Sequence, residues 1–291
     1  MHIDRSPGRL NIGHQCGTLA AAAGLATILC IAGCGSHSPS TQASPSGAST
    51  SPANRSPSAT GTASLAKKAM VTARLIAQAL VDQSSAKTSA LIGHVAGPVM
   101  PSYLRMEALW DEVNAAAAGS QAQPGTVTSM LGGFQICYAQ QGGCQSLTDF
   151  HWDSVGRITD FAVDGQLISP RLAVGGTYSG SVLTFSSVYS YLETAYGEVT
   201  VIFEVRNTSG DALGSAKQPA FLPEFVTAGG TQVTYDTDRS TITDGPLPPG
   251  AVTAGVAVFD TTVLTGQFIL RANDANERSL AAATLRKLPA P

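Results

Sequence analysis

The sequence predicts an α+β protein in which a small unit of helices and a curved antiparallel sheet precedes an all-β sandwich. Two observations predict the first unit. Apolar residues recur at three- and four-residue spacing between Leu65 and Val113, and from Thr126 the apolar period shortens to two. The third observation is a series of short alternating segments, separated by Gly-, Pro- and Asn-containing turns, over residues 173–291. Helices followed by runs of strands are the pattern of an α+β chain.

Residues 1–33 are typical of a bacterial export signal. Arg5 and Arg9 lie in a short basic leader, and the run from Thr18 to Gly33 holds no charged residue. A basic start, an apolar centre and a small-residue exit are the three parts of such a signal. The apolar run is shorter than the ~20 residues that a membrane-spanning helix needs. We therefore expect the segment to be removed by a peptidase.

The end of this segment, Ile31-Ala-Gly-Cys34, resembles the bacterial lipoprotein motif, in which an aliphatic and two small residues precede the modified cysteine. The resemblance implies cleavage before Cys34, a diacylglycerol on its thiol, and a place on the extracytoplasmic side of the cell membrane. Two acyl chains are enough for stable anchoring. A register ending at Cys30 is disfavoured because it puts the bulky Leu29 beside the cut. An ordinary secretory signal with an unmodified cysteine is the other alternative.

Residues 34–63 are predicted to be the lipidated cysteine and a disordered tether. From Gly35 to Ala63 the chain is dominated by Ser, Pro, Thr, Gly and Ala and contains no Leu, Ile, Val or aromatic residue. Such a segment has too little apolar surface to offset the entropy lost on ordering. Ser and Thr beside Pro also permit O-glycosylation.

Each of the five cysteines can be assigned to the signal, the lipid anchor or a disulfide. Cys16 and Cys30 leave with the signal and Cys34 takes lipid, so Cys137 and Cys144 remain. In an oxidising compartment this pair most simply forms a disulfide across a hairpin loop. Zinc binding is weaker because no His flanks the pair, and the spacing is not that of a CxxC redox motif.

The charge balance excludes one class of partner. The chain has 17 Lys and Arg and 20 Asp and Glu, and loss of Arg5, Arg9 and Asp4 with the signal leaves a net charge of −4. Nucleic-acid binding needs clustered positive charge, so we predict no nucleic-acid partner. The low charge and the abundance of Ala, Gly, Ser and Thr resemble proteins of high-GC actinobacteria.

The first unit is predicted to cover residues 64–172. Ser64 is a candidate cap for a helix that ends at Asp82, and a second helical region is broken by Gly97-Pro98 and Pro101 before it ends at Ala118-Gly119. Period-two segments and turn residues follow. The expected strands are 133–139, 147–152, 158–163 and 166–168, with a turn at 153–156 and a two-residue hairpin at Asp164-Gly165.

This order of elements, together with Cys137-x6-Cys144, Thr148-Asp-Phe150 and Ile158–Gly165, resembles the cone-shaped nuclear-transport-factor and ketosteroid-isomerase class. The resemblance implies an apolar pocket. An isomerase-like site would need a carboxylate base in a dry cone and an oxyanion donor opposite it.

The nearby candidates for those two roles are Asp149, Asp160 and Tyr138. A strand Asp beside a hairpin more often faces solvent. His94 and His151 do not lie beside a Ser in a recognisable elbow motif. We predict no catalytic residue.

The second unit is predicted to cover residues 173–291. In the segment 198–206, Val199, Val201, Phe203 and Val205 share one face and polar residues take the other, which predicts a half-buried strand. Residues 279–288 are either a short helix or a frayed strand. About seven strands with regular turns are typical of an immunoglobulin-like sandwich. The other expected strands are 180–185, 221–227, 231–235, 252–258 and 266–270.

Four phrases of this unit, Val201–Ser209, Pro219–Val226, Leu247-Pro-Pro-Gly250 and Val256–Phe259, resemble a telokin-like domain of unknown function that recurs in bacterial lipoproteins. The resemblance implies a secreted sandwich with a binding or scaffold role and transfers no catalytic residue.

Two Asx-rich loops raise the question of calcium. They contain Asp236, Asp238 and Asp244 on one side and Asn273, Asp274, Asn276 and Glu277 on the other. Neither has EF-hand spacing, and Asn and Asp support turns without a metal. We predict no metal and no cofactor.

These observations favour a non-enzymatic cell-surface lipoprotein that acts as a binding or scaffold module. Its partners would be the membrane, through Cys34, and a protein, a cell-wall polymer or a small apolar ligand. The ligand-binding residues are not identified by the sequence. Two alternatives stay open: an isomerase-like or hydrolase-like enzyme that uses the first unit, and a structural spacer or surface antigen.

Overall fold

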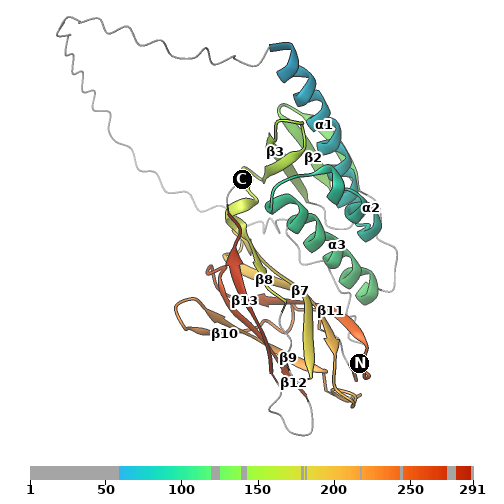
Figure 1. Cartoon of the computed structure of the whole chain (residues 1–291), viewed down its shortest axis with the longest axis vertical. Coiled ribbons are helices and arrows are strands. Elements are labelled where there is room, and N and C mark those ends of the chain that lie inside the picture. The colour runs from blue at the N-terminus through green and yellow to red at the C-terminus, as the bar shows by residue number, and fades with distance from the viewer. Residues whose placement is uncertain are drawn as a thin grey trace, which may run out of the picture.

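The computed structural model describes residues 59–118, 125–138, 143–177, 180, 182–216, 218–242, 245–273 and 280–289. Within these residues a helical layer and a five-stranded sheet lie above a larger eight-stranded sheet (Figure 1). The predicted α+β class is confirmed at this level. No helix in the described part of the chain is long and apolar enough to span a membrane.

The first helix, α1 (Ala59–Asp82), starts five residues before the expected cap at Ser64. Residues 59–63 of the expected tether are therefore helical, and the prediction of their disorder is wrong. Alanine has the highest helix propensity and recurs through this segment, so the helix extends beyond its apolar stripe. It ends where Gln83 takes a left-handed conformation, with φ 52°, as residues after a helix commonly do.

The helical layer continues through α2 (Ser85–Ala90), the short 3-10 turn η1 (Ile92–His94) and α3 (Val99–Ala118). The expected break at Pro101 does not occur. Pro101 is the third residue of α3, and the amide groups of the first turn have no partner within a helix, so a proline there removes no hydrogen bond.

The smaller sheet is an antiparallel meander in the order β1-β2-β3-β4-β5. The Asp164–Gly165 turn is confirmed, since both residues have positive φ (51° and 76°) as a type I′ hairpin requires. Helix α1 packs against β1, β2 and β3. The strands are β1 (Thr126–Met130), β2 (Gly133–Cys137), β3 (Cys144–Trp152), β4 (Ile158–Val163) and β5 (Gln166–Leu167).

The larger sheet has the order β10-β9-β12-β13-β6-β7-β8-β11. The chain after β10 bridges to β11 at the other edge, where the Asp236 amide donates to the Val258 carbonyl at 2.8 Å. The eight strands thus form one barrel-like sheet around an apolar core. They are β6 (Leu172–Gly175), β7 (Leu183–Glu193), β8 (Glu198–Asn207), β9 (Phe221–Thr227), β10 (Gln232–Thr234), β11 (Val252–Phe259), β12 (Gly266–Ala272) and β13 (Leu280–Lys287).

Residues 279–288 were expected to form either a short helix or a frayed strand, and Leu280–Lys287 form a strand. Strand β13 pairs with β12 on one side and β6 on the other. The helix alternative for residues 279–288 is therefore wrong.

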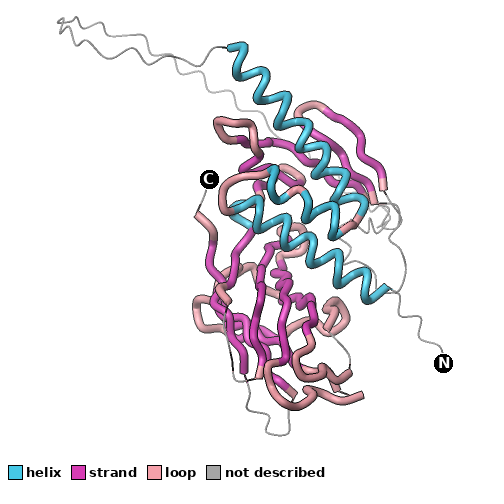
Figure 2. Tube along the Cα trace, turned by 45° about the vertical axis from the view of Figure 1, so that its right-hand side comes forward, coloured by secondary structure: helices cyan, strands magenta, loops and turns pink. Residues whose placement is uncertain are grey.

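Strand β8 is buried on both faces, so its prediction as a half-buried strand is wrong. Phe203 lies in the core of the larger sheet. Ile202, on the opposite face, belongs to the same apolar cluster as Tyr103 of α3. The reason is that α3 lies against β8 and β11 (Figures 1 and 2). The two units therefore share an apolar interface.

Candidate functional site

The predicted lipidation site lies outside the described residues. Cys34, the motif before it and residues 35–58 of the tether precede the first described residue, Ala59.

The predicted disulfide is confirmed. Cys137 at the end of β2 and Cys144 at the start of β3 are direct partners in the antiparallel register, with sulfur atoms 2.02 Å apart. The bond closes the connection between the two strands. It fastens one end of the five-stranded sheet.

The three residues considered for an isomerase-like site are not gathered into one. Asp149 is exposed, with φ 49°, at an irregularity in β3. Asp160 is 1% exposed, and its Oδ1 accepts from the Phe161 amide at 2.9 Å while Oδ2 has no hydrogen-bond partner. Successive strand residues point to opposite faces, so Asp160 points away from the face of Phe161. Tyr138 packs at the margin of the helical core.

Aromatic rings occupy the space between the helices and the face of the sheet that carries Phe161. The Phe150 and Phe161 rings are stacked 5.3 Å apart, and Tyr103 of α3 meets Phe161 edge-on at 5.7 Å. Phe134 adds a fourth ring, 6.3 Å from Phe150. Such pairs stabilise a core beyond their buried area. At this point, where the cone resemblance implies a pocket, the chain's own side chains pack together.

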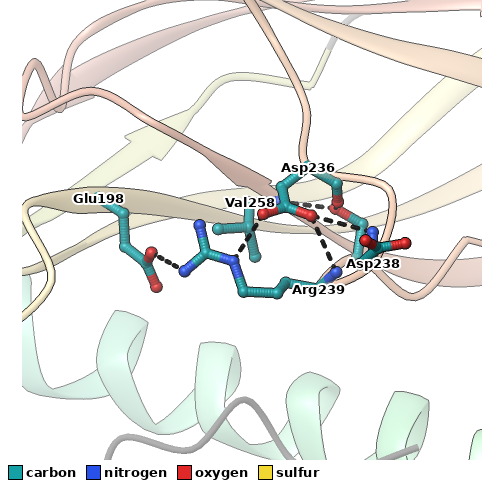
Figure 3. Close-up of polar contacts among 6 residues, drawn as sticks. Glu198, Asp236, Asp238, Arg239 and Val258 are labelled. Atoms are coloured by element: carbon teal, nitrogen blue, oxygen red, sulfur yellow. Dashed lines mark hydrogen bonds and ion pairs between the residues drawn. The ribbon is translucent and has the colours of Figure 1, made fainter.

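A buried charge network lies where β7 ends and β8 begins, although alternation along 198–206 predicted that Glu198 faces solvent. Glu193 and Glu198 are direct partners in the antiparallel register and are 2% and 3% exposed. Each carboxylate has its own arginine. Arg171, from the 3-10 turn η2 (Ser169–Arg171), lies 3.5 Å from Glu193 Oε2, and Arg239 pairs with Glu198 (Figure 3). Two carboxyl groups are thereby held side by side.

The Arg171 side of the network is closed from water. Its guanidinium lies 4.5 Å from the centre of the Tyr191 ring, a cation–π distance, and its Nε donates to the Leu192 carbonyl at 3.0 Å. Burial raises the pKa of Glu193 to about 7 against the attraction of Arg171. Glu193 Oε1 has no hydrogen-bond partner, which is consistent with a carboxyl group that is neutral over part of the physiological range.

The Arg239 side includes the first of the two Asx-rich loops. Asp236 accepts from the Asp238 amide at 2.9 Å and from Arg239 Nε at 2.7 Å (Figure 3). The hydrogen bond from Arg239 lowers the pKa of Asp236. This carboxylate is thus used to fix its own turn and to orient Arg239.

Of the four residues named in the second Asx-rich loop, the structure describes Asn273. Its side chain donates to the Pro219 carbonyl at 3.0 Å. Asp244, Asp274, Asn276 and Glu277 lie outside the described residues. Within the described residues no group of three or more His, Cys, Asp or Glu side chains is placed to hold a metal ion.

The Asn-x-Ser phrase of the telokin-like resemblance has a structural role. Asn207 is fully buried, its Nδ2 donates to the carbonyls of Asp211 and Leu247 at 2.8 and 2.9 Å, and its Oδ1 accepts from the Ser209 amide. One side chain therefore joins the end of β8 to the two segments beside it.

The chain matches no protein-family model, and no curated protein or solved structure was found to be similar to it.

Proposed function

We propose that this chain is a lipoprotein anchored through Cys34 to the extracytoplasmic side of the cell membrane, and that its folded part acts as a binding or scaffold module. The observation that carries the proposal is the sequence Ile31-Ala-Gly-Cys34 after a basic start and an apolar run. The disulfide between Cys137 and Cys144 supports it, because such bonds persist in oxidising compartments outside the cytoplasm.

The buried polar groups of the folded part favour a scaffold over a reaction centre. Arg171 forms an ion pair with Glu193, and Arg239 forms one with Glu198. The side-chain amide of Asn207 donates to two backbone carbonyl groups. These groups fix strand ends. Within this proposal the larger unit is a variant of the immunoglobulin-like sandwich and the smaller one a filled cone, and their surfaces bind a protein, a cell-wall polymer or a small apolar ligand.

Detergent phase partition of bacterial cells that express the chain tests the anchor. The wild-type chain is expected in the detergent phase, because two acyl chains dominate its partition. Cys34→Ala is expected to move it to the aqueous phase or to leave an unprocessed precursor. Cys30→Ala, in the competing register, is the matched control and leaves the partition unchanged. A Cys34→Ala chain that has lost its signal and still partitions like the wild type would contradict the proposal.

A further inference from the structure

One end of the five-stranded sheet exposes a group of apolar side chains that have no role in the proposed function. Leu131, in the turn between β1 and β2, is 99% exposed, and Met130 beside it is also exposed. Trp152 at the end of β3 is 37% exposed, and Val155 lies exposed in the turn that follows. We call these four residues the turn patch.

The strand register places both turns at the same end of the sheet. Phe134 pairs with Leu147, so the β1–β2 turn lies beside the later half of β3, which ends at Trp152. Figures 1 and 2 show turns of this sheet beside the first half of α1. Lys68 of α1 donates from Nζ to the Val155 carbonyl at 3.0 Å. The first half of α1 therefore lies at this end of the sheet.

Two lysines lie on the helix beside the turn patch. Lys67 and Lys68 are exposed on α1, which has no acidic residue before Asp82. The start of a helix adds a partial positive charge. Of the acidic residues near the patch, Asp153 is paired with Arg157 at 2.8 Å and Asp149 is exposed. Basic residues beside exposed apolar groups suit the anionic surface of a membrane.

The position of the anchor indicates what covers this surface. Only residues 35–58 separate Cys34 from the start of α1, and 24 residues reach at most ~80 Å when fully extended. A lipid on Cys34 thus leaves this end of the fold within reach of the bilayer. Tryptophan is the side chain most enriched, together with tyrosine, at the membrane–water interface.

We propose that the turn patch contacts the headgroup region of the membrane that carries the lipid anchor, with Leu131 and Trp152 inserted among the headgroups. The inference rests on the proposed anchor at Cys34 and adds a second, non-covalent contact. That contact orients the folded part, with the eight-stranded sheet held away from the lipid.

Tryptophan quenching tests this contact. The full lipidated chain is reconstituted in vesicles of phosphatidylcholine and phosphatidylglycerol, with or without bromine on the acyl chains. The chain has two tryptophans, and Trp110 is buried in the core, so a Trp152→Phe variant supplies its background emission. We expect brominated lipid to quench the emission that Trp152→Phe lacks. Equal emission from Trp152 in both kinds of vesicle would overturn the proposal.

Paired substitutions connect the quenching to the patch. Leu131→Asp and Val155→Asp are expected to reduce it, because both place a charge where lipid should be. Val263→Asp, at a 40% exposed apolar position of the larger unit, is the matched control and should leave it unchanged. If a second copy covered the patch instead, Trp152 would be shielded from aqueous acrylamide but not quenched by bromine, which also overturns the membrane contact.

The two proposals fail in different ways. A chain that does not sediment with the vesicles has no lipid anchor, and this outcome would overturn the proposed function and the contact together. A chain that sediments while its Trp152 is not quenched is anchored without the contact. That outcome overturns the present inference alone.

Discussion

The buried carboxyl of Glu193 makes the stability of the fold depend on pH in a direction that a single substitution can isolate. Glu193→Gln keeps the size of the side chain and removes its titration. Arg171 attracts the charged form of Glu193, while burial, Glu107, Glu198 and Asp164 oppose it. Because Gln does not titrate, the difference between wild type and variant reports on this one group.

The sign and size of the effect follow from linkage. Glu193 has a pKa of about 7 in the folded protein, against an ordinary value of 4.5, so the folded state holds a proton that the unfolded state has already released. The resulting stabilisation is complete below pH 4.5 and is lost as the pH rises through about 7. One pKa unit corresponds to 1.36 kcal/mol, so the total loss is about 3 kcal/mol.

Urea unfolding of both proteins at a series of pH values measures this difference. We expect the free energy of unfolding of the wild type to fall relative to Glu193→Gln between pH 4.5 and 7.5, and the two curves to run parallel on either side of that window. Parallel curves across the whole range would refute the reasoning, since they would mean that Glu193 ionises alike in both states.

Two further predictions concern packing in the larger unit. Asn207→Ala removes several buried hydrogen bonds worth about 1 kcal/mol each, so it should lower the free energy of unfolding by roughly 3 kcal/mol in urea denaturation; a loss below 1 kcal/mol would mean that water replaces them. Gly255→Ala places a methyl 2.6 Å from the Phe203 ring and should cost about 1–3 kcal/mol by overpacking. Gly176→Ala, with no atom within 4 Å of the new methyl, is its control, and equal stability of the two variants would contradict the packing.

Local sequence patterns predicted the hairpins well and the end of the chain poorly. The expected strands 158–163 and 221–227 match β4 and β9 residue for residue, because alternation and turn residues act within a few positions. Strand β6 was missed, since the four residues Leu172–Gly175 do not alternate. The Ala- and Leu-rich segment of β13 suits a helix equally well, and only its pairing with β12 and β6 makes it a strand.

The sequence did not predict the charge network, because it too depends on contacts between distant segments. Alternation along β8 assigned Glu198 to a solvent face, which is the usual place for a charged residue. The structure buries that face under α3 and brings in Arg239 from a distant loop. The disulfide, in contrast, was predictable, because Cys137 and Cys144 were the remaining pair after the signal and the lipidated cysteine were assigned.

The mass of the mature N-terminus tests the central claim most directly. Mass spectrometry of the N-terminal peptide, isolated from the membrane fraction, should show a chain that begins at Cys34 and carries a diacylglyceryl group on its thiol. A peptide that extends upstream of Cys34 without modification, or one that begins at Cys34 with a free thiol, would contradict the lipoprotein assignment.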